Sequence, residues 1–490
     1  SLTISRMFST VNVSAVTVSK RNTVPEIYTK AIFPDLVKAV TNLPSAPRVT
    51  GGVTKNVARL FLAKAYLTYG WWLQNPNNIP TYPDVARTDP DGHNAQWYFQ
   101  KAYDTAIEGI SNPGSYALQP TFYDVNVGAN DRNNECMLYA DHTQASAYYN
   151  ESDPVGYGSG WSPDNFAAWM HTWNYTALRS SSSATSWSSV SSVQRAATQP
   201  LGRPWTRMCP TIGVIKNTFA DKTLDSRYDG TFVTKYRGNW DKAGVKNAEL
   251  YNANNLPIKP NDVVLSFLDD DSQTPTYPSG AGQNGVGAGT LPNRADWVIA
   301  PNGISRIVYP GLWKIGTYRT DDPNGLGYPN AGLTRPFSVA KFSEFYFIAA
   351  EAAVKGATGS MSARDLINVI RARAGKWRWN NNGNVAKIQD NSAAMMAATP
   401  ATITIDYILA ERSREYYGEL YRWYDLVRTQ KWGEYAATYQ IGDVNYGNHT
   451  PKTFTRNIQP FHYLRPIPQG QLDAMSMTTE EKAKYQNPGY

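Results

Sequence analysis

Residues 404–432 read TIDYILAERSREYYGELYRWYDLVRTQKW, the most strongly patterned stretch of the chain. Its apolar side chains recur every three or four positions, which predicts the buried face of a helix, either continuous or broken near Gly418. Thr404 is the expected N-cap, and Gly433 follows the expected end. The apolar positions are Ile405, Ile408, Leu409, Tyr416, Leu420, Trp423, Leu426 and Val427.

Charged side chains fill the rest of this stretch. Glu411, Glu415 and Glu419 are four residues apart and so share one side of a helix. A glycoside hydrolase needs two carboxyl groups that flank a sugar bond, and three along one helix rarely make such a pair. Arginines interleave with them, so we interpret the charges as ion pairs within and between helices. These arginines are Arg412, Arg414, Arg422 and Arg428.

The composition indicates which broad class of protein this chain belongs to. The chain has 490 residues, of which 41% are hydrophobic and 13% aromatic. These fractions indicate a folded protein rich in Tyr and Trp. The net charge of +7 comes without a Lys/Arg run, so nucleic acid is not an expected partner. No apolar stretch reaches the roughly 18 residues of a membrane span, and no signal peptide is visible at the start. The two cysteines fit no zinc spacing, and a bridge between them stays open.

Apolar periodicity and local composition divide the chain into three parts. Residues 1–115 and 331–490 have helical periodicity, which predicts stacked helical hairpins, and the last part ends in an extended Pro-rich tail. Residues 116–330 are rich in Gly, Pro, Asn and Ser, which predicts an irregular region that carries the binding surface. Helices are expected at 24–43, 54–72, 94–111, 338–355 and 362–375, a strand at 134–140, and a Ser-rich surface excursion at 180–193.

Aromatic residues with polar neighbours in the irregular region are the candidate ligand contacts. An aromatic face covers the C–H groups of a sugar while nearby amides and carboxylates bind its hydroxyls. Two to four of these residues are expected to form the platform, and the others to be core. The candidates are Trp161, Trp169, Trp173, Tyr175, Trp187, Trp240, Tyr277 and Trp297.

Metal and phosphate chemistry have little support in the sequence. Asp269, Asp270 and Asp271 could hold Ca²⁺ through carboxylate oxygens, but they lack EF-hand spacing, and an exposed acidic turn is the better interpretation. The five histidines are isolated, so no catalytic metal is expected. The run SGAGQNGVGAG at 279–289 has no following Lys in P-loop register. We therefore expect no cofactor.

Several motifs together resemble one known family. RPFSVAKFSEFYFIAAEAA (335–353), SARDLINVIRARAG (362–375), the stretch at 408–432, YLRPIPQGQLDAM (463–475) and the closing YQNPGY are similar, in this order, to the signature of the SusD/RagB family. The signature residues that match are Glu344, Glu351, Arg371, Glu411, Arg412, Glu415, Glu419, Arg422, Trp423, Asp425 and Arg428.

The resemblance implies a fold and a function. Its members are outer-membrane surface lipoproteins that bind nutrients, usually glycans, through an irregular region packed on a tetratricopeptide-like helical scaffold. They sit on a SusC-like TonB-dependent transporter and hand over oligosaccharide without cutting it. The lipid anchor and the first hairpins of the family pattern do not match here, so we expect the chain to begin inside that pattern.

Three alternatives remain open at this stage. The same scaffold could bind peptides instead of glycans, the protein could be a glycoside hydrolase, or the helical repeats could serve as an intracellular adaptor. From the structural interpretation of the charges at 404–432, we expect Glu415→Ala and Arg422→Ala to lower thermal stability without selectively removing ligand binding.

Overall fold

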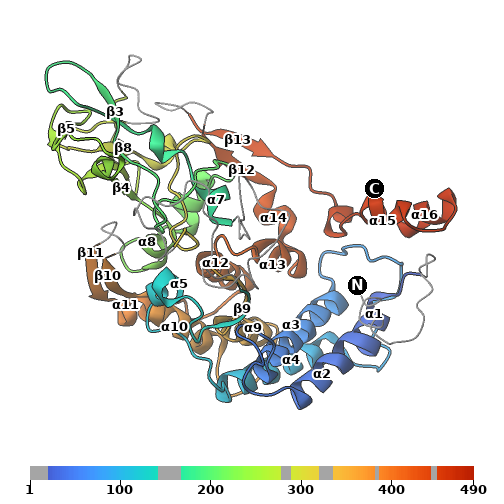
Figure 1. Ribbon diagram of the computed structural model, residues 1–490. Coiled ribbons are helices and arrows are strands. Elements are labelled where there is room, and N and C mark those ends of the chain that lie inside the picture. The colour runs from blue at the N-terminus through green and yellow to red at the C-terminus, as the bar shows by residue number, and fades with distance from the viewer. Residues whose placement is uncertain (1–19, 142–166, 278–288, 319–334, 381–385, 443–449) are drawn as a thin grey trace.

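A computed structural model describes residues 20–141, 167–277, 289–318, 335–380, 386–442 and 450–490. The chain forms an open arc, with helices along its lower edge and a strand-rich region at the upper left (Figure 1). The C-terminal segment runs from the strand-rich region back toward the first helices. The predicted fold class, a mainly helical scaffold that carries a large irregular insert, is confirmed.

The N-terminal helices follow the predicted boundaries closely. Thr54 begins α3 by accepting a hydrogen bond from the Val57 amide, and Asn94 begins α4 by accepting one from Trp97. The segment 24–43 is helical throughout, but a π-helical turn precedes Pro34, whose missing N–H and ring disturb a regular helix. The elements are α1 (Val24–Ile27), η1 (Tyr28–Ile32), α2 (Phe33–Asn42), α3 (Lys55–Gln74) and α4 (Ala95–Ser111).

The second helical block differs from the prediction at its start. Residues Phe337–Lys341 form strand β9, which pairs with β1 (Cys136–Ala140), and the helix α9 begins only at Ser343. The sequence alone could not reveal this strand because its partner lies in a distant part of the chain. Ser362 and Asp365 form a capping box at the start of α10. The helices here are α9 (Ser343–Val354), α10 (Ala363–Ala374) and α11 (Ser392–Ala397).

The stretch 404–432 is not one helix. It forms α12 (Ile405–Glu415) and α13 (Arg422–Arg428), and α14 (Trp432–Ala436) follows. Between the first two helices, Gly418 has φ of 82° and Leu420 has φ of 67°. Such positive values are a left-handed conformation that no α-helix contains. A Cβ on Gly418 would lie 2.7 Å from Cδ1 of Leu312, so glycine also permits close packing against the irregular region. The predicted break near Gly418 is therefore real.

The strands form small, separate sheets. One has the order β3-β2-β5-β6 and is antiparallel, another has the order β4-β7-β8 with β7 and β8 parallel, and three are two-stranded pairs: β1-β9, β10-β11 and β12-β13. The remaining strands are β2 (Arg179–Ser181), β3 (Ser189–Ser191), β4 (Lys235–Arg237), β5 (Leu250–Tyr251), β6 (Pro257–Ile258), β7 (Val263–Phe267), β8 (Trp297–Ile299), β10 (Lys376–Asn380), β11 (Ala386–Asp390), β12 (Thr438–Ile441) and β13 (Lys452–Thr455).

Short helices complete the irregular region and the tail. They are α5 (Phe122–Asn126), η2 (Gly128–Asn130), α7 (Ala167–His171), η3 (Tyr175–Ala177), η4 (Val214–Thr218), α8 (Arg227–Thr231), η5 (Trp240–Ala243), η6 (Pro301–Gly303), η7 (Pro460–Tyr463), α15 (Gln469–Asp473) and α16 (Thr479–Tyr485). Among the described residues, none of these or the longer helices is long and apolar enough to cross a bilayer.

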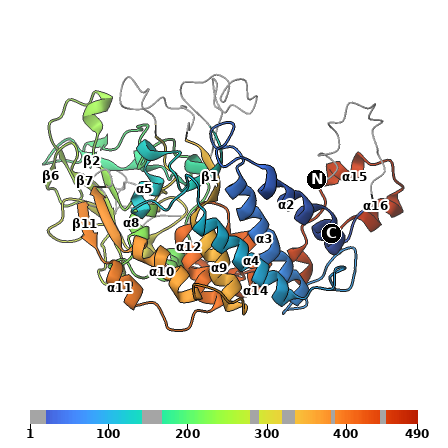
Figure 2. The ribbon, with the colours of Figure 1, turned by 90° about the horizontal axis from the view of Figure 1, so that it is seen from below.

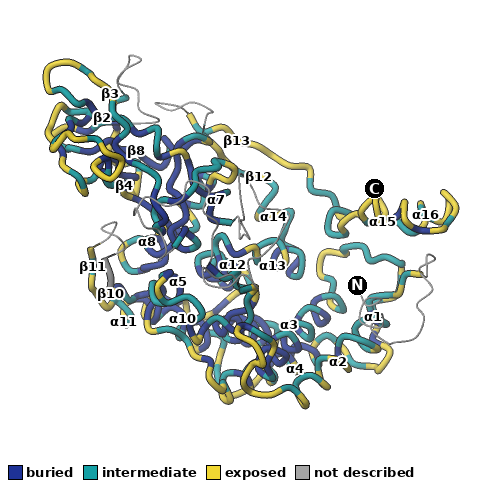
Figure 3. The backbone as a smooth tube through the Cα atoms, viewed as in Figure 1, coloured by how far each residue is buried: buried dark blue, intermediate teal, exposed yellow. Residues whose placement is uncertain are grey.

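Two main hydrophobic cores support the arc. The first lies among α3, α4, α9, α10 and α12, which stack side by side when the molecule is seen from below (Figure 2). The second lies inside the irregular region and is built from aromatic and β-branched residues such as Trp173, Tyr236 and Val264. Buried backbone is concentrated in these two places, while the C-terminal segment is mostly exposed or half-buried (Figure 3). The irregular region is therefore a packed unit and not a set of loose loops.

Candidate ligand-binding site

The structure places most of the predicted aromatic contacts in the interior. Trp173, Tyr175 and Trp240 are 0% exposed, and they belong to the core of the irregular region. Trp173 meets the Tyr236 ring edge-on with centroids 5.4 Å apart, and Trp240 donates its indole N–H to the Asn247 carbonyl at 2.9 Å. These rings have packing partners on their faces and edges, which leaves a ligand no face to stack on.

The other candidates have different surroundings. Trp169 is buried in a small cluster with Ala168 and Trp205. Tyr277 is half-buried near Gly303, and burial raises the pKa of its hydroxyl to about 12. Trp161 lies outside the described residues.

Trp187 and Trp297 are the two candidates that line one pocket together. Their rings meet edge-on, with centroids 6.4 Å apart and planes at 80°. Trp297 is buried and fixed, because its indole N–H donates to the Arg179 carbonyl at 3.0 Å. Trp187 is half-buried at the tip of the β2–β3 hairpin. Both rings line one pocket of about 280 Å³, which is close to the lower end of the range for ligand-binding pockets.

The floor and rim of this pocket come from neighbouring strands of the four-stranded sheet. The β2–β3 hairpin supplies one side, and the turn between β5 and β6 supplies the other. Apart from the two tryptophans, the lining consists of hydroxyl, amide and methyl side chains: Ser181, Ser183, Ala184, Thr185, Ser186, Asn252, Ala253 and Asn255.

Serine side chains hold the hairpin tip in shape. The Ser181 hydroxyl shares its one proton between the Ser183 and Ser186 carbonyls and accepts from the Ser183 and Ser188 amides, at 2.8–3.1 Å. Ser180 and Ser192 bond to each other below it at 3.1 Å. Such local side-chain-to-backbone bonds are typical of Ser in turns. The Ser-rich run predicted as a surface excursion is thus an ordered rim.

An asparagine shapes the opposite side. The Asn252 side-chain carbonyl accepts from the amides of Asn254 and Leu256 at 3.0 and 2.9 Å, which closes the turn. Asn255 takes a positive φ, a conformation that Asn tolerates. Its amide side chain is exposed and makes no hydrogen bond within the described part of the chain. Asn255 therefore offers a donor and an acceptor to a ligand.

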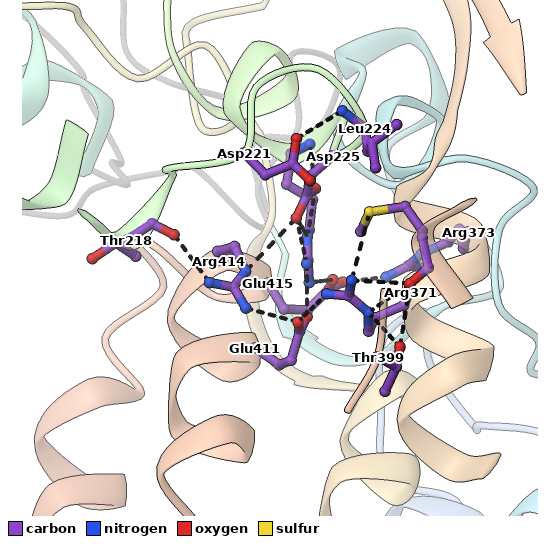
Figure 4. A network of polar contacts seen from close by, with 12 residues as sticks. Thr218, Asp221, Leu224, Asp225, Arg371, Arg373, Thr399, Glu411, Arg414 and Glu415 are labelled. Atoms are coloured by element: carbon purple, nitrogen blue, oxygen red, sulfur yellow. Dashed lines mark hydrogen bonds and ion pairs between the residues drawn. The ribbon is translucent and has the colours of Figure 1, made fainter. Parts of the chain in front are cut away.

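The charged signature residues lie elsewhere, in the interior between the scaffold and the irregular region. Glu411 accepts from Arg227 at 2.7 Å, Arg371 at 2.6 Å and Arg414 at 2.7 Å (Figure 4). Glu415 pairs with Arg373, which also reaches Glu135 beside β1 at 2.6 Å. These bonds join α10, α12, the start of α8 and β1. The structural interpretation of these carboxylates agrees with their surroundings.

The ion pairs continue along the scaffold. Glu419 lies between Lys314 and Lys341, and the distance from Lys341 is 2.8 Å. Asp425 accepts from Arg412 at 2.7 Å and contacts Arg428 at 3.0 Å. The Glu351 carboxylate accepts hydrogen bonds from the Arg428 guanidinium and from the Trp71 indole N–H, both at 2.8 Å. The Glu344 carboxylate accepts one from the Tyr421 hydroxyl at 3.1 Å.

Two signature residues stand apart from this chain of carboxylates. Arg422 donates to the Leu409 carbonyl at 2.9 Å, and the Arg465 guanidinium lies 3.8 Å from the centre of the Trp423 ring.

Burial and pairing act against each other in this network. Burial alone would raise the pKa of the Glu411 carboxyl, but the guanidinium groups of Arg227, Arg414 and Arg371 hold it well below its usual range. Lys314 behaves in the opposite way, since burial lowers its pKa to about 8 despite Glu419. A carboxylate held ionised by three arginines is poorly suited to act as a general acid.

Two carboxylates of the acidic turn have partners within the described part of the chain. Asp271 pairs with Lys216 at 2.7 Å and accepts from the Asn302 amide at 2.9 Å, while Asp270 accepts from the Ser272 amide. Burial raises the pKa of Asp269. No group of three or more His, Cys, Asp or Glu side chains is arranged to hold a metal among these residues. Cys136 and Cys209 are both free.

Some residues of the pocket were not singled out from the sequence. Ser183, Thr185, Asn252 and Asn255 carry no signal of their own, because Ser and Asn are common in loops. The useful signal would have been Trp187 inside a run of serines, since a large aromatic residue in a polar turn needs a packing or binding partner. The β2–β3 hairpin and the turn at 252–255 also come from separate parts of the sequence, and only strand pairing brings them together.

Several solved structures resemble this chain in fold. No match was found among curated proteins. Similar solved structures include a SusD superfamily protein from Parabacteroides distasonis (17% identity, 98% of this chain, 72% of that chain, TM-score 0.49). Another is described as a laminarin binding SusD-like protein (19% identity, 95% of this chain, 69% of that chain, TM-score 0.48). A third is surface glycan-binding protein A from Bacteroides thetaiotaomicron in complex with laminarihexaose (15% identity, 94% of this chain, 70% of that chain, TM-score 0.44).

A family model gives the assignment. The model of the SusD family, SusD_RagB, matches residues 134–490, which is most of the chain and includes the buried ion pairs and the pocket. The resemblance inferred from the motifs at 335–353, 362–375 and 408–432 is confirmed. This chain belongs to the SusD family.

Proposed function

We propose that this protein binds oligosaccharides at the cell surface through the pocket beside Trp187 and passes them to a TonB-dependent outer-membrane transporter without cutting them. The observation that carries the proposal is one half-buried indole ring surrounded by hydroxyl and amide side chains. The ring covers the C–H face of a sugar, and the polar groups bind its hydroxyls. Membership of the SusD family supports the same function.

The lining of the pocket also argues against hydrolysis at this place. Cleavage of a glycosidic bond requires two carboxyl groups on either side of it. No described residue that lines the pocket carries a carboxyl group, and the buried Glu411, Glu415 and Glu419 are paired with cations. The protein therefore captures a glycan and leaves its cleavage to other proteins.

The test is binding of the purified protein to a panel of soluble polysaccharides, measured by calorimetry and affinity electrophoresis. We expect at least one glycan to bind and no reducing ends to appear. Trp187→Ala should weaken that binding about 30-fold, because loss of an aromatic anchor costs about 2 kcal/mol. Tyr424→Ala removes an aromatic residue that is 59% exposed on α13 and serves as the matched control with unchanged affinity.

Two results would contradict the proposal. Binding of peptides with no binding of any glycan would show that the ligand is a peptide. Equal affinity of Trp187→Ala and the intact protein would show that the binding site is not the Trp187 pocket. The transfer of oligosaccharide to a transporter is tested separately. We expect a TonB-dependent transporter to co-purify with this protein from outer membranes. If no such transporter co-purifies, the function is limited to capture of the glycan.

A further inference from the structure

We infer that the Trp187 pocket is selective for uncharged glycans and rejects those that carry carboxylate or sulfate groups. This inference rests on the proposed function and specifies its ligand. None of the described residues that line the pocket is ionisable, in a chain that has 47 Lys and Arg and 40 Asp and Glu. The lack of charge in the lining is therefore a property of this place and not of the composition.

The charged residues nearest in the chain do not supply a cation. Arg294 and Asp296, just before Trp297, form a bidentate pair at 2.9 and 2.6 Å, so each charge neutralises the other. Arg179 is two residues before Ser181 on β2, and its backbone carbonyl holds Trp297, but its side chain does not line the pocket. Lys259 beyond β6 pairs with Glu249 at 3.7 Å.

An anionic sugar would lose water in this pocket without gaining a positive partner. Moving an ionised carboxylate out of water is costly unless a cation and hydrogen-bond donors replace the water. Binding sites for carboxylate and sulfate groups typically use arginine for this purpose. The pocket offers only neutral donors, so a charged sugar would bind more weakly than its neutral counterpart.

A sugar hydroxyl is matched well by the same lining. It exchanges hydrogen bonds with water for hydrogen bonds with neutral groups at little net cost. The exposed amide of Asn255 can donate and accept at once, and the hydroxyl side chains of Ser183, Thr185 and Ser186 line the same pocket. These neutral groups fit the alternating donors and acceptors of a neutral glycan.

The experiment compares two panels at two salt concentrations. Laminarin, xyloglucan and dextran are the neutral probes, and alginate, polygalacturonate and dextran sulfate are the acidic ones. Calorimetry in low salt, about 20 mM NaCl, and in high salt, about 300 mM, changes the screening of charges. A neutral glycan should bind at least about tenfold more tightly than any acidic one. Its Kd should change less than about twofold with salt, because screening acts only on charges.

Variants separate failure of the inference from failure of the function. Arg179→Gln should leave the affinity for the neutral glycan unchanged, while Trp187→Ala lowers it. An acidic glycan that binds more tightly than every neutral one, loses affinity in salt and is weakened by Trp187→Ala or Arg179→Gln would overturn the inference and leave glycan binding intact. No binding of either panel would overturn the proposed function itself.

Discussion

The interior between the helical scaffold and the irregular region is dense with charge, and the pocket at the far side of that region has none. Glu411 alone contacts three arginines in the interior, whereas the lining of the pocket consists of serine, threonine, asparagine, alanine and tryptophan. The residues that look most reactive in the sequence therefore hold the fold together. The residues that look least informative line the pocket beside Trp187.

The difference has a physical origin. Buried ion pairs are strongly oriented, and removal of one partner leaves an unpaired charge out of water, so such networks tie helices and strands together in one arrangement. A neutral rim can release one hydroxyl and take up another with little cost. The first set of contacts suits a permanent junction, and the second suits reversible binding.

The largest expected effect is on the stability of the junction, by which we mean the buried ion pairs around Glu411, Glu415, Glu419 and Asp425. Glu411→Ala removes the carboxylate that three guanidinium groups share and should lower the free energy of unfolding by about 3–5 kcal/mol. Arg227 and Arg414 keep Asp225 as a partner, whereas Arg371 loses its ion pair. Chemical denaturation measures this change. The control is Glu434→Ala, because the Glu434 side chain is 55% exposed beside Lys431. Loss of this surface pair should change stability by less than about 1 kcal/mol. Similar effects of the two variants would remove the distinction between a buried junction and surface pairs.

Acid should affect the junction and spare the pocket. The pKa values of Glu411, Glu419 and Asp425 are lowered in the folded protein by their cationic neighbours, from ordinary values of 4.5, 4.5 and 3.8. Because the unfolded chain binds more protons below these values, the stability from these groups is complete above about pH 5 and is lost as pH falls.

One buried carboxyl acts in the opposite direction. Burial raises the pKa of Asp229 to about 6, which favours the folded state at lower pH and partly offsets the loss between about pH 4 and 6. Melting temperatures between pH 3 and 7 should therefore fall most steeply below about pH 4. Binding of a neutral glycan should stay constant wherever the protein is folded, and a titration of binding between pH 5 and 7 would contradict an uncharged site.

A smaller effect is expected at Arg422. Its guanidinium donates to the Leu409 carbonyl at 2.9 Å and lies 5.4 Å from the centre of the Tyr435 ring. Arg422→Ala should lower the free energy of unfolding by about 1–2 kcal/mol and leave glycan affinity unchanged. Arg456→Ala, at an exposed arginine over Tyr439, is the control with a smaller loss. Lost binding with unchanged melting would show that this signature residue serves the ligand.

The smallest effect is expected in the rim of the pocket. Asn255→Gly removes the exposed amide and keeps the positive φ without strain. The loss of one neutral hydrogen bond should weaken the neutral glycan about 2–10-fold. Asn42→Gly, at an exposed position of α2, should not change the affinity. An effect equal to that of Trp187→Ala would show that the ring is not the main anchor.

Much of the scaffold could be predicted from the sequence. Thr54, Asn94 and Ser362 cap the helices that their positions indicate, because capping and apolar periodicity are local signals. The strand Phe337–Lys341 could not be predicted, since it is defined by pairing with Cys136–Ala140. The left-handed Leu420 could not be predicted either, because leucine seldom takes this conformation, and its side chain is 65% exposed instead of lying on the predicted buried face.

The site was predicted less completely. Trp187 and Trp297 were singled out together with Trp173, Tyr175 and Trp240, and the sequence could not tell which of these rings belong to the expected core. Aromatic residues among Gly, Asn and Ser can face solvent or each other, and only the arrangement of the sheets decides between the two. Asn252 and Asn255 reach the pocket through the β2–β5 pairing, which no local pattern encodes.

The most direct test of the central claim measures melting temperature with and without the bound neutral glycan, for Glu411→Ala and Trp187→Ala side by side. A ligand that binds only the folded state raises the melting temperature in proportion to its affinity. We predict that Glu411→Ala melts well below the intact protein and keeps the glycan-induced rise, while Trp187→Ala melts close to the intact protein and loses it. Normal melting of Glu411→Ala together with loss of its glycan-induced rise would contradict the account.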